Sequence, residues 1–147
     1  MTDQAIEQEI QDKGLTAPRI TPDAIEANIG AEFFFTPASF IAAMDVRKWN
    51  EGFDNEETID RLALLTICVI VLKNGFTVTG ESACASPENF DAEIGRKIAR
   101  QNAVQKIWPL MGYELKQRLA DGQAAPQPPC TNEFVAEGCE QFGEVGQ

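Results

Sequence analysis

The sequence predicts an α+β fold, in which a small antiparallel sheet centred on a β-hairpin at about 62–83 packs against a long helix at about 88–108. Two local patterns lead to this class. An apolar run is joined to an alternating segment by Asn74 and Gly75, the strongest short-range hairpin signal. A hydrophobic repeat of helical period then follows.

The 147 residues are enough for one domain that buries its own core. We expect residues 1–120 to form a single α+β domain, with 37–60 as a variable loop or insertion that includes at most a short helix. Glycine and proline interrupt all periodicity in 121–147, and no basic residue offsets its acids. This segment is therefore predicted to be a flexible acidic tail.

The hairpin prediction can be made specific. Residues 62–72 are apolar on both faces, which is typical of a strand covered on both sides. A two-residue Asn-Gly loop would pair Val71 with Val78. The second strand is expected over about 76–83, where Thr and Glu alternate with apolar residues and Gly.

The N-terminal third contains further helix signals. Residues 1–13 are expected to form a short polar helix that ends at Gly14. Thr21 and Pro22 provide a capping hydroxyl and a proline at the first helical position, so a second helix should begin there and stop near Gly30. Three phenylalanines at 33–35, followed by Thr36, indicate a strand or an extended aromatic segment.

The long helix is expected to have two different faces. Ser86 or Asn89 is a suitable N-cap, and Pro109 is expected to end or kink the helix near Trp108. The first face is apolar and contains Ile94, Ile98 and Trp108. The second is a strip of small residues, which are Ala92, Gly95, Ala99 and Ala103. The helix could therefore contact the sheet and either a neighbouring helix or a second copy of the chain.

Composition excludes or disfavours several functions. The formal net charge of −11 disfavours binding to nucleic acid and to anionic membranes. No apolar run is long enough for a membrane span, and the acidic, polar residues 1–7 are not expected to act as a secretory signal. The chain contains no histidine, no P-loop and no dinucleotide-binding glycine motif, so we expect neither an enzyme nor a cofactor.

The four cysteines do not form a C-x-x-C pair, and their scattered spacing does not suit a metal site. They are expected to be free thiols in a reducing compartment, and no metal is predicted; a redox or metal role is the less favoured alternative. The residues are Cys68, Cys84, Cys130 and Cys139.

Lys and Arg outnumber Asp and Glu only in the middle of the chain, over residues 61–120. Arg96 and Arg100 lie one helical turn apart there, a spacing that can hold one phosphate or pyrophosphate with charge-assisted hydrogen bonds. The competing interpretation, which is favoured without further context, is that they pair with Glu93 or with acids of the first third of the chain.

Aromatic and hydroxyl side chains are available near these arginines. Phe90 and Phe76 could stack on a base, although aromatic side chains more often fill cores. Ser82 lies beside the expected helix start, where hydroxyls also serve as ordinary caps.

The block NGFTVTGESACASPENFDAEIGRKIA (74–99), followed by NAVQKIWPLMGYELKQRL (102–119), resembles a widespread group of small tailed-phage proteins. The resemblance covers about 15–35 and 62–119, whereas 37–60 and the tail differ. This group includes the type-one Thoeris anti-defence proteins, which bind a cyclic ADP-ribose isomer made by host immune enzymes and do not cleave it. Some members also hold cyclic oligonucleotides.

The resemblance implies an α+β homo-oligomer, either a dimer or a trimer of dimers, whose ligand pockets lie between the subunits. It also implies that the protein acts in the host cytoplasm. It implies that Arg96 and Arg100 contact phosphates, that Phe90 or Phe76 stacks on adenine, and that Asn89 hydrogen-bonds a ribose or a base edge. The alternative function is that of a phage early protein that binds and inhibits a host protein.

Overall fold

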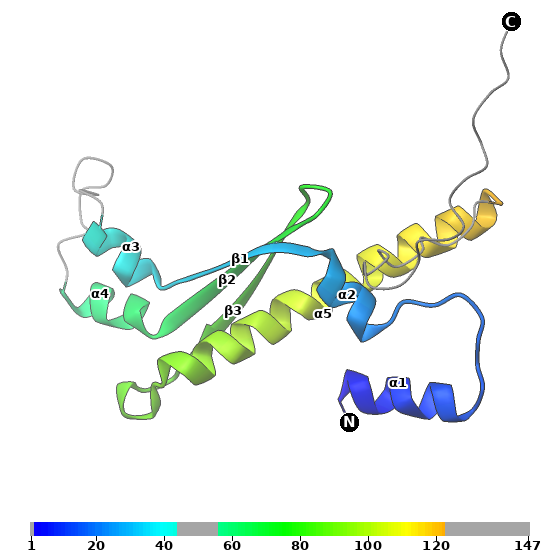
Figure 1. The fold of residues 1–147 in the computed structure, drawn as a ribbon. Helices are drawn as coiled ribbons and strands as arrows, with labels where there is room; N and C mark the ends of the chain where they lie inside the picture. Colours follow the sequence, from blue (N-terminus) through cyan, green and yellow to red (C-terminus); the bar gives the residue numbers. More distant parts are fainter. Residues whose placement is uncertain (1, 44–55, 123–147) are drawn as a thin grey trace, which may run out of the picture.

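The computed structural model describes residues 2–43 and 56–122. A three-stranded antiparallel sheet of order β1-β2-β3 is crossed on one face by a long helix, α5 (Ala92–Ala120) (Figure 1). The strands are β1 (Ile29–Phe35), β2 (Leu65–Leu72) and β3 (Thr77–Ala83). The predicted α+β class and the sheet centred on the hairpin are confirmed.

Two short helices precede β1. Helix α1 (Asp3–Asp12) is capped by Thr2, and α2 (Pro22–Asn28) by Thr21, with Pro22 in its first turn as expected. Gly14 has φ 65°, a conformation that favours glycine after a helix end. Gly30 does not stop α2: the helix ends at Asn28, and Gly30 lies inside β1 next to a register shift between Ile29 and Ala31.

Two more helices lie between β1 and β2, at the end of the sheet opposite the hairpin turn (Figure 1). They are α3 (Pro37–Ala43) and α4 (Glu56–Ala63). The strand predicted from residue 62 therefore begins only at Leu65. Acids in the first turn of α4 and Arg61 in its last turn suit the helix dipole, which explains why the helix continues to residue 63. Residues 44–55 of the expected variable loop, the tail from 123, Cys130 and Cys139 lie outside the described residues.

The hairpin forms, but its predicted register is wrong by one residue. Val78 lies opposite Ile70 and not opposite Val71. The Leu72 N–H donates to the Phe76 carbonyl at 2.8 Å, which leaves a three-residue loop in which Gly75 has φ 87°. Because β2 is apolar at nearly every position, its sequence does not distinguish the two registers.

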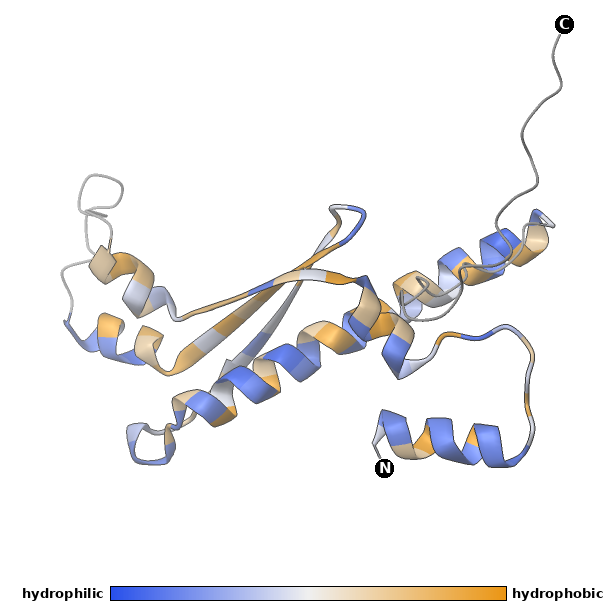
Figure 2. Cartoon of the chain, viewed as in Figure 1, coloured by the Kyte–Doolittle hydropathy of each residue, from blue (hydrophilic) through white to orange (hydrophobic). Residues whose placement is uncertain are grey.

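The expectation that β2 is covered on both sides is also wrong for the described residues. Its buried positions alternate along the strand and face α5. On the other face, Phe33 is 58% exposed and lies opposite Val69, while Phe35 is 37% exposed and lies opposite Ile67. Figure 2 shows hydrophobic residues along β1 and β2. This open sheet face is therefore apolar and uncovered at Phe33, whereas at Phe35 it is packed by α3, whose Phe40 ring centroid lies 6.4 Å from that of Phe35.

Helix α5 starts and ends later than predicted. Pro87–Asn89 form a short 3-10 turn, and Asp91 caps α5 by accepting a hydrogen bond from the Ile94 N–H at 2.9 Å. Pro109 lies inside the helix, which continues to Ala120. Proline removes one backbone donor, but the residues after it can still form the helical bonds of the next turns.

Most of the small-residue strip of α5 packs on the sheet, and of the predicted apolar face only Trp108 packs against the core. Gly95, Ala99 and Ala103 are buried, whereas Ile94 is 56% and Ile98 is 43% exposed. A Cβ at Gly80 would lie only 2.1 Å from the Ala99 carbonyl oxygen. The helix can therefore lie this close to β3 only because Gly80 has no side chain.

Side chains of α5 also cover the outer edge of β3. Asn102 Nδ2 donates to the Glu81 carbonyl at 2.8 Å, and Lys106 Nζ donates to the Thr79 carbonyl at 2.6 Å. At the opposite edge of the sheet, the outward-facing backbone groups in the middle of β1 have no hydrogen-bond partner among the described residues. The two sheet edges therefore differ: side chains of α5 donate hydrogen bonds to backbone carbonyls of β3, whereas the edge formed by β1 is open.

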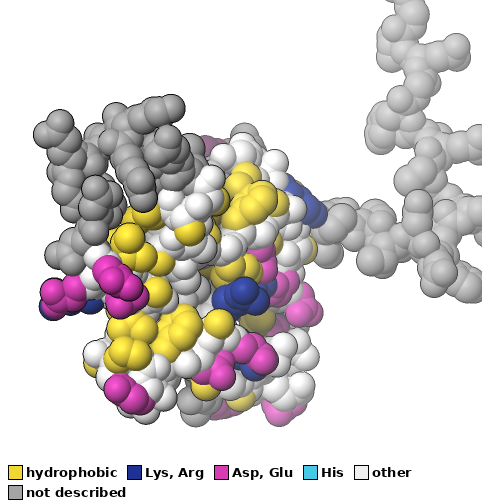
Figure 3. Space-filling view, turned by 90° about the vertical axis from the view of Figure 1, so that its left-hand side faces the viewer, with side chains coloured by type: hydrophobic (Ala, Val, Ile, Leu, Met, Phe, Trp, Pro, Cys, Tyr) yellow, Lys and Arg dark blue, Asp and Glu magenta, His cyan; other side chains and the backbone are white. Residues whose placement is uncertain are grey.

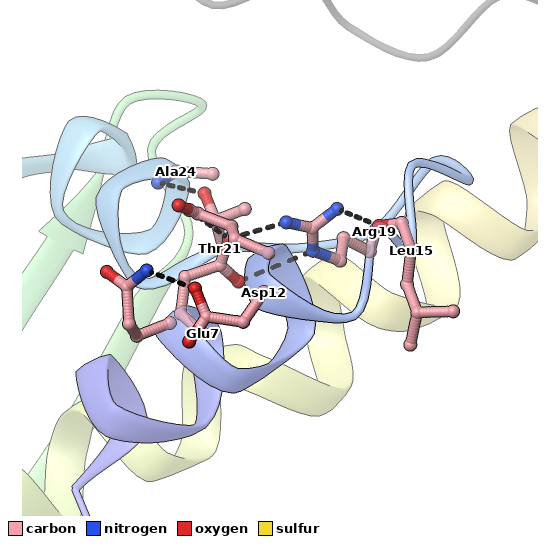
Figure 4. A network of polar contacts seen from close by, with 8 residues as sticks. Glu7, Asp12, Leu15, Arg19, Thr21 and Ala24 are labelled. Carbon is pink, nitrogen blue, oxygen red and sulfur yellow. Dashed lines mark hydrogen bonds and ion pairs between the residues drawn. The ribbon is translucent and has the colours of Figure 1, made fainter.

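Helix α1 is attached through one ion pair (Figure 4). Arg19 Nη2 contacts Glu7 Oε1 at 2.6 Å, and Arg19 Nη1 donates to the Leu15 carbonyl at 2.8 Å. The hydrogen bond from Arg19 and a second from Gln11 lower the pKa of Glu7. The Glu7 carboxylate is thus held in its charged form by the segment that follows α1.

We expect Gly80→Ala to destabilise the fold by about 3 kcal/mol or more, because the new Cβ would overlap the backbone of α5. Gly112→Ala is the matched control within α5, since its Cβ would meet no atom within 4 Å. It should stabilise the helix by about 0.5–1 kcal/mol. Urea unfolding measures both changes, and equal stabilities for the two variants would contradict the close packing.

The attachment of α1 should depend on pH. The contribution of Glu7 is complete above the ordinary carboxyl pKa of 4.5 and is lost as the pH falls through the lowered pKa of the folded state. Amide exchange in α1 should accelerate over this range in the wild type, whereas Glu7→Gln should remove the dependence. Glu9→Gln is the control, because Glu9 pairs only with Lys13 on the same helix in the described structure. An unchanged pH profile in Glu7→Gln would refute this role.

Candidate functional site

Two clefts lie side by side at the end of the sheet where α5 begins. The Arg96 cleft has a volume of about 230 Å³ and is lined by Phe34, Phe35, Thr36, Ser39, Thr66, Phe90, Ala92 and Arg96. The Asn89 cleft has a volume of about 200 Å³, and its lining includes Thr66, Ser82, Cys84, Asn89, Phe90 and Asp91. Thr66 and Phe90 line both clefts, so the two are adjacent.

The loop from 84 to 91 positions several of these side chains. The Cys84 N–H donates to the Leu64 carbonyl at 3.0 Å, which anchors the loop to the start of β2. Asn89 Nδ2 donates to Ser86 Oγ at 3.3 Å, and the Phe90 N–H donates to the Pro87 carbonyl. This compact turn brings Asn89 and Phe90 to the mouth of the clefts, next to the first turn of α5.

Arg96 is the basic residue that lines the Arg96 cleft. Within residues 2–43 and 56–122, no carboxylate forms an ion pair with it, whereas its neighbour Lys97 pairs with Glu93 at 2.7 Å. Figure 3, which faces this end of the molecule, shows basic side chains next to hydrophobic ones. Arg96 is therefore available to an anion that enters the cleft.

Arg100 is placed differently, although it lies one turn further along α5. Its guanidinium contacts Glu26 at 2.6 Å and Glu32 at 2.7 Å. These hydrogen bonds, first with Glu26 and then with Glu32, raise the pKa of Arg100. The alternative considered from the sequence, pairing with acids of the first third of the chain, is thus confirmed for Arg100, and this residue lines neither cleft.

The structure brings together four of the six predicted site residues, since Ser82, Asn89, Phe90 and Arg96 all line the two clefts. Phe76 does not join them. It follows the hairpin turn at the other end of the sheet, where it is 54% exposed (Figure 1).

Sequence reasoning missed three cleft residues that carry hydroxyl groups. Thr36 and Ser39 bond each other's backbone N–H at 3.1 and 3.2 Å. That reciprocal cap at the start of α3 was a recognisable signal in the sequence Thr-Pro-Ala-Ser. Thr66 has a weaker signal, as a polar residue inside the apolar run of β2.

The described residues contain no group of three or more His, Cys, Asp or Glu side chains that could hold a metal ion. Of the helices in this part of the chain, none is long and apolar enough to cross a membrane. Cys68 is buried beneath α5, and burial, followed by the charge of Glu32, raises the pKa of its thiol. Cys68 therefore remains a protonated, packed side chain at neutral pH.

Comparison with known proteins identifies the family to which this chain belongs. No curated protein and no solved structure matches this chain. The model of a family described as Phage protein (N4 Gp49/phage Sf6 gene 66) matches residues 20–119, which include all three strands and nearly all of α5. Because this match spans about two thirds of the 147 residues, the chain belongs to the phage N4 Gp49/phage Sf6 gene 66 protein family.

Proposed function

We propose that this phage-family protein binds and sequesters a cyclic nucleotide immune signal of the glycocyclic ADP-ribose type and does not cleave it. The observation that carries the proposal is Arg96, a cation at the wall of a cleft with no ion-pair partner among the described residues, in a chain of net charge −11. A guanidinium in that position suits a diphosphate.

The other cleft residues suit the remaining parts of a nucleotide. Phe90 offers an aromatic face for a base, and Asn89 and Ser82 offer hydrogen bonds to a base edge or a ribose. Each cleft alone, at about 200 or 230 Å³, is smaller than the roughly 300–1,000 Å³ typical of small-molecule sites. The proposed ligand therefore occupies both clefts, with its phosphates on the Arg96 side.

A second copy of the chain would complete the site. The Asn89 cleft is open to solvent and is bordered by Ile94 and Ile98, which are 56% and 43% exposed. Exposed apolar side chains at the rim of an open cleft favour a subunit contact. A homo-oligomer with the ligand between subunits, a dimer or a trimer of dimers, is part of this proposal, and so is action in the host cytoplasm.

Sequestration acts by mass action and requires no chemical step. The protein lowers the free concentration of the signal when it is present in molar excess and its Kd lies below the signalling concentration. Intact ligand should then be recovered after the protein is denatured by heat. Such recovery would distinguish a sequestering protein from an enzyme that destroys the signal.

We expect Arg96→Ala to reduce capture of glycocyclic ADP-ribose by at least tenfold, because about 1.5–3 kcal/mol of charge-assisted hydrogen bonding is lost. Lys97→Ala is the matched control: it removes the adjacent positive charge, which pairs with Glu93 outside both clefts. Depletion of the ligand from solution, followed by mass spectrometry of the heat-released fraction, measures capture. Equal capture by wild type and Arg96→Ala would exclude this site.

Arg100 should contribute to stability rather than to capture. Arg100→Gln removes the contacts with Glu26 and Glu32 and should destabilise the fold by about 1–2 kcal/mol, because the side chain of Glu32 is only 27% exposed. Capture should stay within about threefold of the wild type. Loss of capture with unchanged unfolding would instead place Arg100 in the ligand site.

Inhibition of a host protein is the second candidate function. The open sheet face, with Phe33 and Phe35 exposed, favours it, because large exposed apolar patches commonly bind other proteins. A stoichiometric host protein retained from a lysate by the wild type, and not by Phe33→Ser, would support this alternative. The absence of ligand depletion would then be the expected companion result.

A further inference from the structure

The Thr66 hydroxyl is a buried polar group without a partner. Thr66 is 3% exposed, and its Oγ1 forms no hydrogen bond within the described residues. It lies in β2 on the face that α5 covers, where a Cβ on Gly95 would come within 2.9 Å of Oγ1. The helix therefore packs closely around this atom and supplies no hydrogen bond to it.

Such an arrangement is costly for the free protein. A buried hydroxyl without a partner loses its hydrogen bonds to water and gains nothing in return. Valine has nearly the same shape as threonine and would fill the same space without that loss. Trp108 Nε1 also lacks a partner among the described residues, but of the two residues only Thr66 lines the clefts, so a ligand bound there can supply the missing hydrogen bond.

The location of Thr66 identifies the part of the ligand that it would contact. Thr66 lines both clefts, whereas Arg96 lines only one and Asn89 only the other. In any nucleotide the ribose connects the phosphate to the base. A ligand with its phosphates at Arg96 and its base in the Asn89 cleft thus has its ribose at the junction, where Thr66 and Phe90 meet both clefts.

We infer that Thr66 Oγ1 hydrogen-bonds an oxygen of the ligand's ribose and makes the site selective for a ribose at the junction of the two clefts. This assignment rests on the proposed function. In the free chain the atom has no access to solvent. The proposed contact requires the ligand to displace the cleft wall beside Phe90, which is half-buried and lies in the 84–91 loop.

Thr66→Val and Thr66→Ser separate a ligand contact from a structural role. Thr66→Val keeps the shape and removes the hydroxyl, so its thermal midpoint without ligand should equal or exceed that of the wild type. Its affinity for glycocyclic ADP-ribose, measured by calorimetry, should fall about tenfold. Thr66→Ser keeps the hydroxyl and should bind within about threefold of the wild type, despite a lower midpoint from the lost methyl group.

The results distinguish two failures. Equal affinity in wild type and Thr66→Val would overturn the assignment of Thr66 while leaving the proposed function intact. A lower midpoint of Thr66→Val without ligand would also overturn it, because the hydroxyl would then have a partner inside the free protein. A wild type that does not bind glycocyclic ADP-ribose at all would overturn the proposed function, and this assignment with it.

Discussion

The contact between α5 and β3 at Gly80 determines how the long helix lies on the sheet. A side chain at this position would overlap the backbone at Ala99 and Ala103. Because the backbones touch, the helix cannot shift along the sheet without losing the fit of its small residues. The first turn of α5 is thereby fixed beside the start of β2, and Arg96 and the 84–91 loop come together there.

Local signals in the sequence were sufficient for the elements but not for their pairing. Thr21 and Pro22 placed the start of α2, and Asn74 and Gly75 placed the hairpin, because capping and turn formation depend on neighbouring residues. The register was not predictable, since β2 is apolar on both faces and only contact with α5 selects one of them. Pro109 was expected to end or kink the helix near Trp108, and it does not end it, because the loss of one backbone donor is weaker than the hydrogen bonds and packing of the helix on either side.

The candidate site was predictable where its residues are close in sequence. Ser82 lies at the end of β3, Asn89 and Phe90 lie in the loop that follows, and Arg96 lies near the start of α5, so their proximity follows from one connection. Arg100 differs because its partners, Glu26 and Glu32, come from α2 and β1, and only the tertiary fold brings these acids to it. This ion-paired cluster leaves Arg96 as the cleft arginine in an otherwise acidic chain. Thr66 is separated from all of these residues in sequence, and its missing partner is visible only in three dimensions.

The unequal edges of the sheet limit how this protein can polymerise. Asn102 and Lys106 occupy carbonyl groups of β3, so an incoming strand would have to displace them before it could pair there. A strand from another chain is therefore expected to pair with β1. The Glu32 carboxylate of β1 is ion-paired with Arg100, so its charge is balanced and does not repel the incoming strand. If two chains paired through β1, the open edge of the sheet in each chain would be occupied. Growth would then stop at a closed pair, because neither chain would have a second open strand edge from which a fibre could extend.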